Sequence, residues 1–287
     1  GAMLIDAADN AGIPIPRFCY HKKLSIAANC RMCLVDIERA PKPMPACATP
    51  VSEGMIVRTR SEKARNAQKS VMEFLLINHP LDCPICDQGG ECELQDLSIP
   101  YGKDTSLFTE EKLSVVDKDL GALIATHMTR CIACTRCVRF GDEIAGLREM
   151  GATGRGDNVE VGTYVTKELV SEISGNIIDI CPVGALTAKP SQYQARPWEY
   201  VSHDPLSIHD GLGTNTTIHT LRGEINRVVP RQNEEVNEVW ISDRDRFSYE
   251  SIMASDRALT PLVRMGSEGL KSESWMNALA AARMALE

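Results

Sequence analysis

The chain has 287 residues, room for two or three domains, and its 43% apolar content is ordinary for a globular protein. Acidic residues outnumber basic ones, 39 to 31, and the net charge of −8 argues against a broad surface for nucleic acid or anionic lipid. No apolar run approaches the ~20 residues of a membrane helix, and the start lacks the features of a signal peptide. We therefore expect any membrane link to come through another subunit.

Eleven cysteines, an odd number, stand out in this composition. In a chain with no recognisable export signal, they favour metal binding over disulfides. All of them lie between Cys19 and Cys181, and the last 106 residues contain none. They fall into groups of four, three and four.

The first group consists of a single cysteine, a close pair and another single cysteine. Its members are Cys19, Cys30, Cys33 and Cys47. A C-x2-C pair between single cysteines is the plant-ferredoxin arrangement for a [2Fe–2S] cluster, although the first gap there is four residues and here it is ten. Zinc ribbons pair their ligands two and two. Residues Met32 to Ile37 alternate apolar and polar, which predicts a half-buried strand beside the ligands.

A helix is predicted between the first and second groups. Thr59 to Glu62 fits a capping box, and the helix should end near Asn78, before Pro80. Its predicted apolar stripe is Ala64, Ala67, Val71, Phe74 and Leu75.

The second group has only three cysteines, so a four-ligand site needs another donor. His79 stands three residues before Cys83, at the predicted helix exit. Taken alone, a histidine there is more often a cap or surface residue, but an adjacent site short of one ligand reverses that expectation. The predicted [4Fe–4S] ligands are His79, Cys83, Cys86 and Cys92.

The third group carries the most specific spacing. Three cysteines in C-x2-C-x2-C with a remote Cys-Pro match the bacterial ferredoxin run for [4Fe–4S], and the predicted ligands are Cys131, Cys134, Cys137 and Cys181. A two-cluster ferredoxin would place its other cysteines at Ser171, Ser174 and Ile177, so the second cube is predicted to be absent. The four arginines that flank ligands are expected to be solvated, the alternative being that some offset the negative charge of the clusters and hydrogen-bond their sulfurs: Arg31, Arg130, Arg136 and Arg139.

Glycine-rich and cysteine-free segments complete the chain. Residues 151–162 lack the Lys-Ser/Thr ending of a phosphate loop and are predicted to form a turn. Thr217 to Val229 is expected to be a hairpin around Arg222-Gly223, and residues 272–287 a helix.

Four runs give the chain a resemblance to a known family: IPRFCYHKKLSIAANCRMCLVDIE, NHPLDCPICDQGGECELQD, MTRCIACTRCVRF and SGNIIDICPVGALTAK. They resemble the large iron–sulfur subunit of NADH:quinone oxidoreductase, respiratory complex I. The resemblance implies one [2Fe–2S] and two [4Fe–4S] clusters on the ligands named above. It implies a relay subunit without catalytic residues or a substrate of its own, within a complex that couples electron transfer to proton translocation.

The resemblance also implies partners and a location. Electrons would enter from the flavin-bearing NADH dehydrogenase subunit, pass the [2Fe–2S] cluster, the four-cysteine cube and the histidine-ligated cube, and leave towards quinone through another iron–sulfur subunit. The chain would lie in the peripheral arm, on the cytoplasmic face of a bacterial inner membrane or the matrix face in mitochondria, without inserting into the membrane or binding nucleic acid.

The expected fold class is α+β, with a plant-ferredoxin-like domain, a helical His/Cys domain, a bacterial-ferredoxin-like domain and a β-rich module resembling the molybdopterin-oxidoreductase 4Fe–4S domain. Without cysteines that module cannot bind a cluster here. The sequence is expected to be a fragment, with the first ferredoxin hairpin missing, GAM a cloning scar or strand remnant, and the last helix truncated. The expected domains are 1–57, 58–110, 111–195, 196–252 and 253–287.

Three alternatives belong to other classes. An iron-only hydrogenase keeps the second ferredoxin cube, which this chain lacks. A relay chain of a NAD-reducing hydrogenase or a formate dehydrogenase is nearer, by fold analogy. A zinc-stapled scaffold is the non-redox alternative, and iron and acid-labile sulfide counts discriminate against it.

Overall fold

The computed structural model describes residues 1–164, 167–264 and 269–287. It divides into two units, Gly1–Arg246 and Phe247–Glu287, and each is described by itself. Helices and small sheets are mixed throughout, and the strand pairs in the described part of the chain are antiparallel. This agrees with the expected mixture of helices and strands.

The first unit begins with a helix and a three-stranded sheet of order β2-β1-β3. Their bounds are α1 Leu4–Asn10, β1 Leu34–Ile37, β2 Met44–Pro45 and β3 Val57–Arg58. The predicted alternating strand is confirmed, and the structure begins it at Leu34, opposite Pro45. Its side chains and those of α1 form one apolar core, which includes Ile5, Val35, Cys33 and Cys47.

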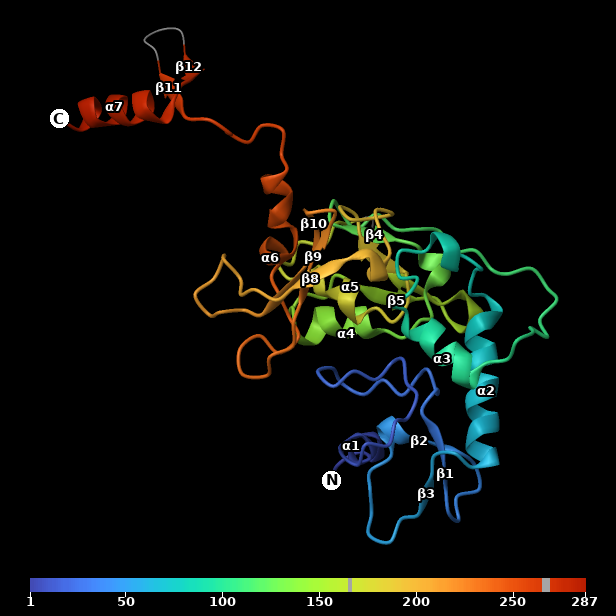
Figure 1. Cartoon of the computed structure of the whole chain (residues 1–287). Helices are drawn as coiled ribbons and strands as arrows, with labels where there is room; N and C mark the ends of the chain where they lie inside the picture. Colours follow the sequence, from blue (N-terminus) through green and yellow to red (C-terminus); the bar gives the residue numbers. More distant parts are fainter. Residues whose placement is uncertain (165–166, 265–268) are drawn as a thin grey trace. The chain divides into compact units, whose positions relative to one another are not determined.

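Helix α2, Glu62–Ile77, contacts β1 and continues towards α3, Glu93–Tyr101 (Figure 1). The predicted helix is confirmed, but its cap is Ser61 rather than Thr59. Backbone at Ser61 is extended, and its hydroxyl accepts a hydrogen bond from the backbone N–H of Ala64. Because the first helical residue is Glu62, only Ser61 lies at the right distance to cap that amide.

The apolar stripe predicted for α2 is partly wrong. Phe74 is 73% exposed, whereas Gln68 and Met72 are buried. Both lie on the same face of the helix as Ala64. Gln68 is accommodated because its side-chain amide donates to the carbonyl oxygen of Leu34, at 3.0 Å. Counting apolar residues alone misses a buried amide that finds a backbone partner.

The ferredoxin-like region, residues 121–188, packs two helices and two strand pairs around a core that contains Phe140 and Ile177. The elements are β4 Ile124–Thr126, α4 Arg136–Glu143, β5 Gly151–Thr153, β6 Glu160–Gly162, α5 Asn176–Ile180 and β7 Leu186–Ala188. Strand β4 pairs with β7, and β5 pairs with β6. Residues 151–162, predicted to be a turn throughout, form a hairpin instead: β5 and β6 occupy the two ends of the segment and only residues 154–159 make the connection.

A second three-stranded sheet, β10-β9-β8, follows. Its strands are β8 Val201–His203, β9 Thr216–Leu221 and β10 Glu224–Pro230. The predicted hairpin is confirmed: Arg222 and Gly223, with φ of 53° and 90°, make its two-residue turn. We refer to residues 196–230 as the β module. The first unit ends within helix α6, Asp243–Phe247.

The second unit contains a strand pair, β11 Leu262–Arg264 with β12 Leu270–Ser272, and helix α7 Trp275–Leu286. The predicted helix is confirmed, and the Ser274 hydroxyl caps it by accepting from the N–H of Asn277. Among the described helices, none combines the length and apolar character needed to cross a bilayer.

Candidate metal centres

The first four-cysteine group lies in the loops around β1 and β2. Pairing of these strands brings Cys33 beside Cys47, and the N–H of Ala46 donates to the Cys33 carbonyl at 3.0 Å. Cys19, Cys33 and Cys47 are each about 1% exposed, and Cys30 is half-buried. The structure therefore gathers all four predicted ligands near one core.

These four thiols interact with one another. The backbone N–H of Cys19 donates to the Cys30 sulfur at 3.4 Å. Hydrogen bonds from the thiols of Cys30 and Cys47 lower the pKa of Cys19, and a hydrogen bond with Cys47 lowers the pKa of Cys33 to about 7. Ala28 and Arg31 have φ of 52° and 60°, so the loop curls around Cys30. The same hydrogen bonds between thiols raise the pKa of Cys30 and Cys47, so the thiolate is favoured at two of the four positions and the thiol at the other two. Four buried sulfurs that contact one another suit iron ligation.

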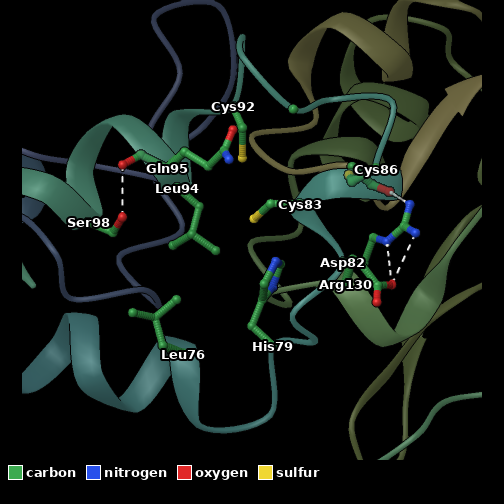
Figure 2. Close-up of a pocket in the computed structure, with 12 residues that line it drawn as sticks. Leu76, His79, Asp82, Cys83, Cys86, Cys92, Leu94, Gln95, Ser98 and Arg130 are labelled. Carbon is green, nitrogen blue, oxygen red and sulfur yellow. Dashed lines mark hydrogen bonds and ion pairs between the residues drawn. The ribbon is translucent and has the colours of Figure 1, made fainter. Parts of the chain in front are cut away.

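The second group surrounds a cavity of about 70 Å³. Figure 2 shows His79, Cys83 and Cys92 turned towards the same space. Its predicted ligands all line it: His79, Cys83, Cys86 and Cys92. Cys83 is exposed while Cys86 and Cys92 are buried, so the cavity opens on the side of Cys83.

The clearest sign of a metal site is the imidazole of His79. It follows the end of α2 at Asn78, as expected, and its buried Nδ1 has no hydrogen-bond partner among the described residues. Burial, with Lys112 and Arg130 nearby, lowers the pKa of His79 to about 4, so the imidazole is neutral at physiological pH. A buried unpaired nitrogen is costly, and a metal ion would satisfy it.

Gly184 shapes the same cavity from the other side. A side-chain carbon at this position would overlap the sulfur of Cys86. Cys92, as a thiol, donates to the carbonyl of Pro182 at 3.7 Å, so residues 182–184 contact two of the three cysteines. The neutral imidazole, the thiols and the glycine cradle fit the predicted cluster.

The third group lines a smaller cavity of about 20 Å³: Cys131, Cys134, Cys137 and Cys181. Burial raises the pKa of Cys131 and of Cys181 to about 11 each. The backbone winds around the sulfurs, since Ala133 has φ of 51° and its N–H donates to the Cys131 sulfur at 3.3 Å. Four buried sulfurs with backbone amides around them fit a [4Fe–4S] cube. Free thiolates would be costly in this buried place, and the positive charge of the irons would offset theirs.

Within the described residues, no three His, Cys, Asp or Glu side chains form a group that could hold one metal ion. In a zinc site all ligands approach one point to within about 2.3 Å. A [4Fe–4S] cube has one ligand on each of four separate irons, so its ligands surround a larger space.

The interpretation of Arg130 and Arg136 as solvated is wrong. Both are 4% exposed. Arg130 pairs with Asp82 at 3.0 Å and contacts the Gly184 carbonyl, while Arg136 pairs with Glu93 at 2.7 Å. Tertiary packing buries these guanidinium groups because each finds a carboxylate and backbone acceptors.

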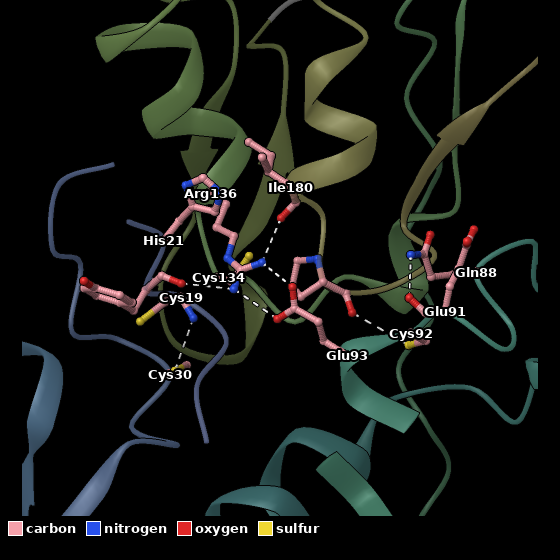
Figure 3. A network of polar contacts seen from close by, with 12 residues as sticks. Cys19, His21, Cys30, Gln88, Glu91, Cys92, Glu93, Cys134, Arg136 and Ile180 are labelled. Atoms are coloured by element: carbon pink, nitrogen blue, oxygen red, sulfur yellow. Dashed lines mark hydrogen bonds and ion pairs between the residues drawn. The ribbon is translucent and has the colours of Figure 1, made fainter. Parts of the chain in front are cut away.

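Arg136 joins all three cysteine regions. Figure 3 shows Arg136 with Glu93 and with Ile180, to whose carbonyl it donates at 3.1 Å. It also donates to the carbonyl of Tyr20, at 3.0 Å. These three residues each directly neighbour a predicted ligand, one in each group. Arg139 is half-buried and donates to the carbonyls of Cys19 and Cys134, whereas Arg31 is exposed as expected.

One apolar cluster contains cysteines of all three groups. Cys92 is buried in it, and Cys30, Cys131 and Cys181 pack against it. Phe18, Met32 and Met72 fill its centre. At least one cysteine of each candidate site therefore contacts this one apolar cluster.

Ser171, Ser174 and Ile177 occupy the place of a second ferredoxin cube with ordinary protein contacts. Ile177 is buried in the core, and the Ser174 hydroxyl donates to Asp243 at 2.6 Å. Asn176, fully buried, exchanges two hydrogen bonds with the backbone of Ile241, at 2.7 and 3.0 Å. Residues 174–176 are thus held by residues 241–243, a later segment of the chain.

Sequence reasoning missed Gly184, Arg130 and Arg136 as parts of these sites. Gly184 follows Cys181-Pro182 closely, and that proximity is a signal that could have drawn attention to it. The burial of the arginines depends on Asp82 and Glu93, 48 and 43 residues away, and no local pattern reveals it.

Four family models match the chain in succession. They are a 2Fe-2S iron-sulfur cluster binding domain at residues 1–62, the NADH-ubiquinone oxidoreductase-G iron-sulfur binding region at 68–106, the ferredoxin-like domain of NADH-quinone oxidoreductase subunit 3 at 121–187, and the NADH-ubiquinone oxidoreductase NDSU1/NuoG-like 4Fe-4S domain at 202–250. In this chain the last match contains no cysteine.

Curated relatives match over nearly the whole chain. The mitochondrial NADH dehydrogenase [ubiquinone] iron-sulfur protein 1 of Solanum tuberosum is 53% identical over 98% of this chain and 38% of its own length. An NADH-quinone oxidoreductase subunit of Rickettsia felis is 52% identical over 97% of this chain and 41% of its own length. The chain thus spans about two fifths of the length of these relatives.

A solved structure is also similar. It is a crystal structure of a NAD+-reducing [NiFe]-hydrogenase in the H2-reduced state, with a TM-score of 0.61, 26% identity, and coverage of 67% of this chain and 83% of that chain. The identity to the NADH-quinone oxidoreductase subunits is twice as high and extends over more of the chain. By that identity and the succession of matching domains, the chain belongs to the family of large iron–sulfur subunits of NADH-quinone oxidoreductase.

Proposed function

We propose that the chain is the electron-relay part of an NADH:quinone oxidoreductase, holding one [2Fe–2S] and two [4Fe–4S] clusters. The observation that carries this proposal is the single apolar cluster to which all three cysteine groups contribute. Sites that contact one apolar cluster are neighbours, and a relay requires neighbouring cofactors. The matches to NADH-quinone oxidoreductase subunits give the relay its context.

The twelve proposed ligands divide evenly. Cys19, Cys30, Cys33 and Cys47 would hold the [2Fe–2S] cluster; His79, Cys83, Cys86 and Cys92 one cube; and Cys131, Cys134, Cys137 and Cys181 the other. The unpaired Nδ1 of His79 supports its place in this set. With it, every cysteine in the chain has a role.

The contacts between sites support the proposed electron order. Arg139 touches the carbonyls of Cys19 and Cys134, so the first site adjoins the third. Cys92 contacts Pro182, next to Cys181, so the third adjoins the second. The four-cysteine site thus adjoins both other sites, as the proposed order requires.

Iron–sulfur clusters, when bound, accept and release single electrons. The chain's own residues would keep water from the sulfurs and balance the added negative charge. The guanidinium groups of Arg136 and Arg139 both act on Cys134, and a buried charge interacts more strongly than one in water. Backbone N–H groups at Cys19 and Ala133 donate to sulfurs of the first and third groups.

The wider assembly follows from the family. The proposed partners are the flavin-bearing NADH dehydrogenase subunit and further iron–sulfur subunits, in the peripheral arm of the complex, on the cytoplasmic or matrix side. The whole complex would couple the relay to proton translocation. We also propose that the β-rich region, residues 196–252, corresponds to the molybdopterin-oxidoreductase-like module, following cluster domains at 1–57, 58–110 and 111–195.

A relay chain of a NAD-reducing hydrogenase is the second candidate, favoured by the similar crystal structure. The two candidates share the same use of cysteines, and they differ in the electron donor. An assay of cluster reduction distinguishes them. The first candidate predicts reduction by NADH in the presence of the flavin subunit, and the second predicts reduction by hydrogen in the presence of a [NiFe] subunit.

Iron and acid-labile sulfide measured after oxygen-free purification test the relay proposal. We expect about ten of each per chain. Zinc in place of iron, with no sulfide, would overturn the proposal and leave an interaction scaffold.

A further inference from the structure

The β module holds the loop that carries the three cysteines of the His79 site. This loop, residues 83–92, contains only a short 3-10 turn, Cys83–Ile85, before α3 begins at Glu93. Regular secondary structure therefore does not fix its shape. We refer to residues 83–92 as the cysteine loop.

Arg196 binds the first half of the cysteine loop. Its guanidinium donates to the carbonyl of Cys86 at 2.7 Å and to that of Pro84. A side-chain carbon at Gly89 would lie 2.6 Å from an Arg196 nitrogen and 2.9 Å from the Cys83 carbonyl oxygen. Glycine at this position thus lets the arginine reach the loop.

Arg227 binds the second half. It forms two parallel hydrogen bonds with Glu91, at 2.7 and 2.8 Å, and Glu91 directly precedes Cys92. The guanidinium is fixed in turn by His219, which accepts from its Nε at 2.8 Å, and by the Tyr200 ring 4.8 Å away. Tyr200 stacks on His219 with 5.3 Å between ring centroids. Such a preoriented bidentate pair constrains geometry as well as adding attraction.

A third contact lies between these two. Gly90 has φ of 99°, a conformation that favours glycine, and a side-chain carbon there would come within 2.5 Å of the Trp198 ring. Arg196, Trp198 and Arg227 thus contact the loop along its length. All three belong to the β module, which has no cysteine and no ligand of its own.

We propose that Arg196 and Arg227 are positioning residues for the cluster at His79, which they serve by fixing the cysteine loop from outside the cluster domain. The proposal rests on the proposed function, since it presumes a cluster on this loop. The β module then contributes to the relay by holding a neighbouring domain's ligands in place. Among the described residues, neither arginine is hydrogen-bonded to the other two sites, which should therefore be indifferent to both substitutions.

The test compares iron release from the full chain, purified without oxygen, to an iron chelator. Variants are Arg196→Ala, Arg227→Ala and Arg227→Lys, with Arg222→Ala in the exposed hairpin turn as the matched control. We expect the two alanine variants to release about four of the ten irons roughly tenfold faster, which corresponds to ~1.4 kcal/mol. Arg227→Lys keeps the charge but loses the bidentate geometry, so its rate should follow that of Arg227→Ala.

Electron paramagnetic resonance of the reduced chain identifies the cluster affected. We expect the signal of the histidine-ligated cube, assigned as the one lost in His79→Ala, to broaden or disappear while the other two persist. Unchanged release rates and signals would overturn the inference, as would equal loss of all three clusters or wild-type behaviour of Arg227→Lys. A wild-type chain without iron and sulfide would instead refute the proposed function.

Discussion

Replacement of Arg136 by methionine tests whether this buried arginine joins the three cysteine regions. The change removes the ion pair with Glu93 and leaves the carbonyls of Tyr20 and Ile180 without their donor. Each unsatisfied carbonyl costs about 1 kcal/mol. Breaking a buried ion pair costs about 3–5 kcal/mol, but Glu93 is 43% exposed and water can solvate it, which removes most of that cost. We therefore expect a loss of about 2–3 kcal/mol.

Thermal unfolding followed by circular dichroism measures the effect. For a chain of this size, such a loss lowers Tm by roughly 4–12 °C. Arg31→Met is the matched control, because Arg31 also flanks a predicted ligand but is exposed, and it should change stability by no more than about 0.5 kcal/mol. If Arg136→Met lowered Tm no more than Arg31→Met, the reasoning about the junction would be refuted.

Three further predictions concern single positions. Gly184→Ala should cost about 1–3 kcal/mol and release the cluster at His79 while sparing the other two, because the added carbon overlaps the Cys86 sulfur; an unchanged iron count would contradict this. His79→Ala should shift the reduction potential of that cluster or lower the iron count, whereas no change in either would exclude imidazole ligation. Hydrogen bonding to Arg17 lowers the pKa of Asp9 in the folded chain below its unfolded value of 3.8. The pair therefore stabilises the fold fully at pH above 3.8, and its contribution disappears as the pH falls through the folded pKa of Asp9. The difference in Tm between the wild type and Asp9→Asn should therefore stay constant from about pH 7 to about pH 5 and shrink below 3.8, and a difference that grew in acid would contradict the pairing.

Local spacing made the cysteine groups predictable. A C-x2-C pair or a triplet brings sulfurs together within one loop, so the three groups could be recognised before any fold was known. His79 is predicted by the same logic, because it stands a few residues before Cys83. The hairpin at Arg222-Gly223 was predictable because two adjacent residues determine its turn.

Features that depend on distant residues could not be predicted. Arg136 is buried because Tyr20, Glu93 and Ile180 converge on it from three parts of the chain. Phe74 is exposed and Gln68 buried because β1 offers a carbonyl at one face of α2. Periodicity describes which face of a helix is apolar, but it does not identify polar partners contributed by another element.

The contacts that replace a second ferredoxin cube have a consequence for the order of assembly. Residues 174–176 and 241–243 are joined by hydrogen bonds between protein groups, among them those of Asn176 with Ile241 and Ser174 with Asp243. These hydrogen bonds involve protein groups alone, so we expect the seam to form on folding of the chain without any need for iron.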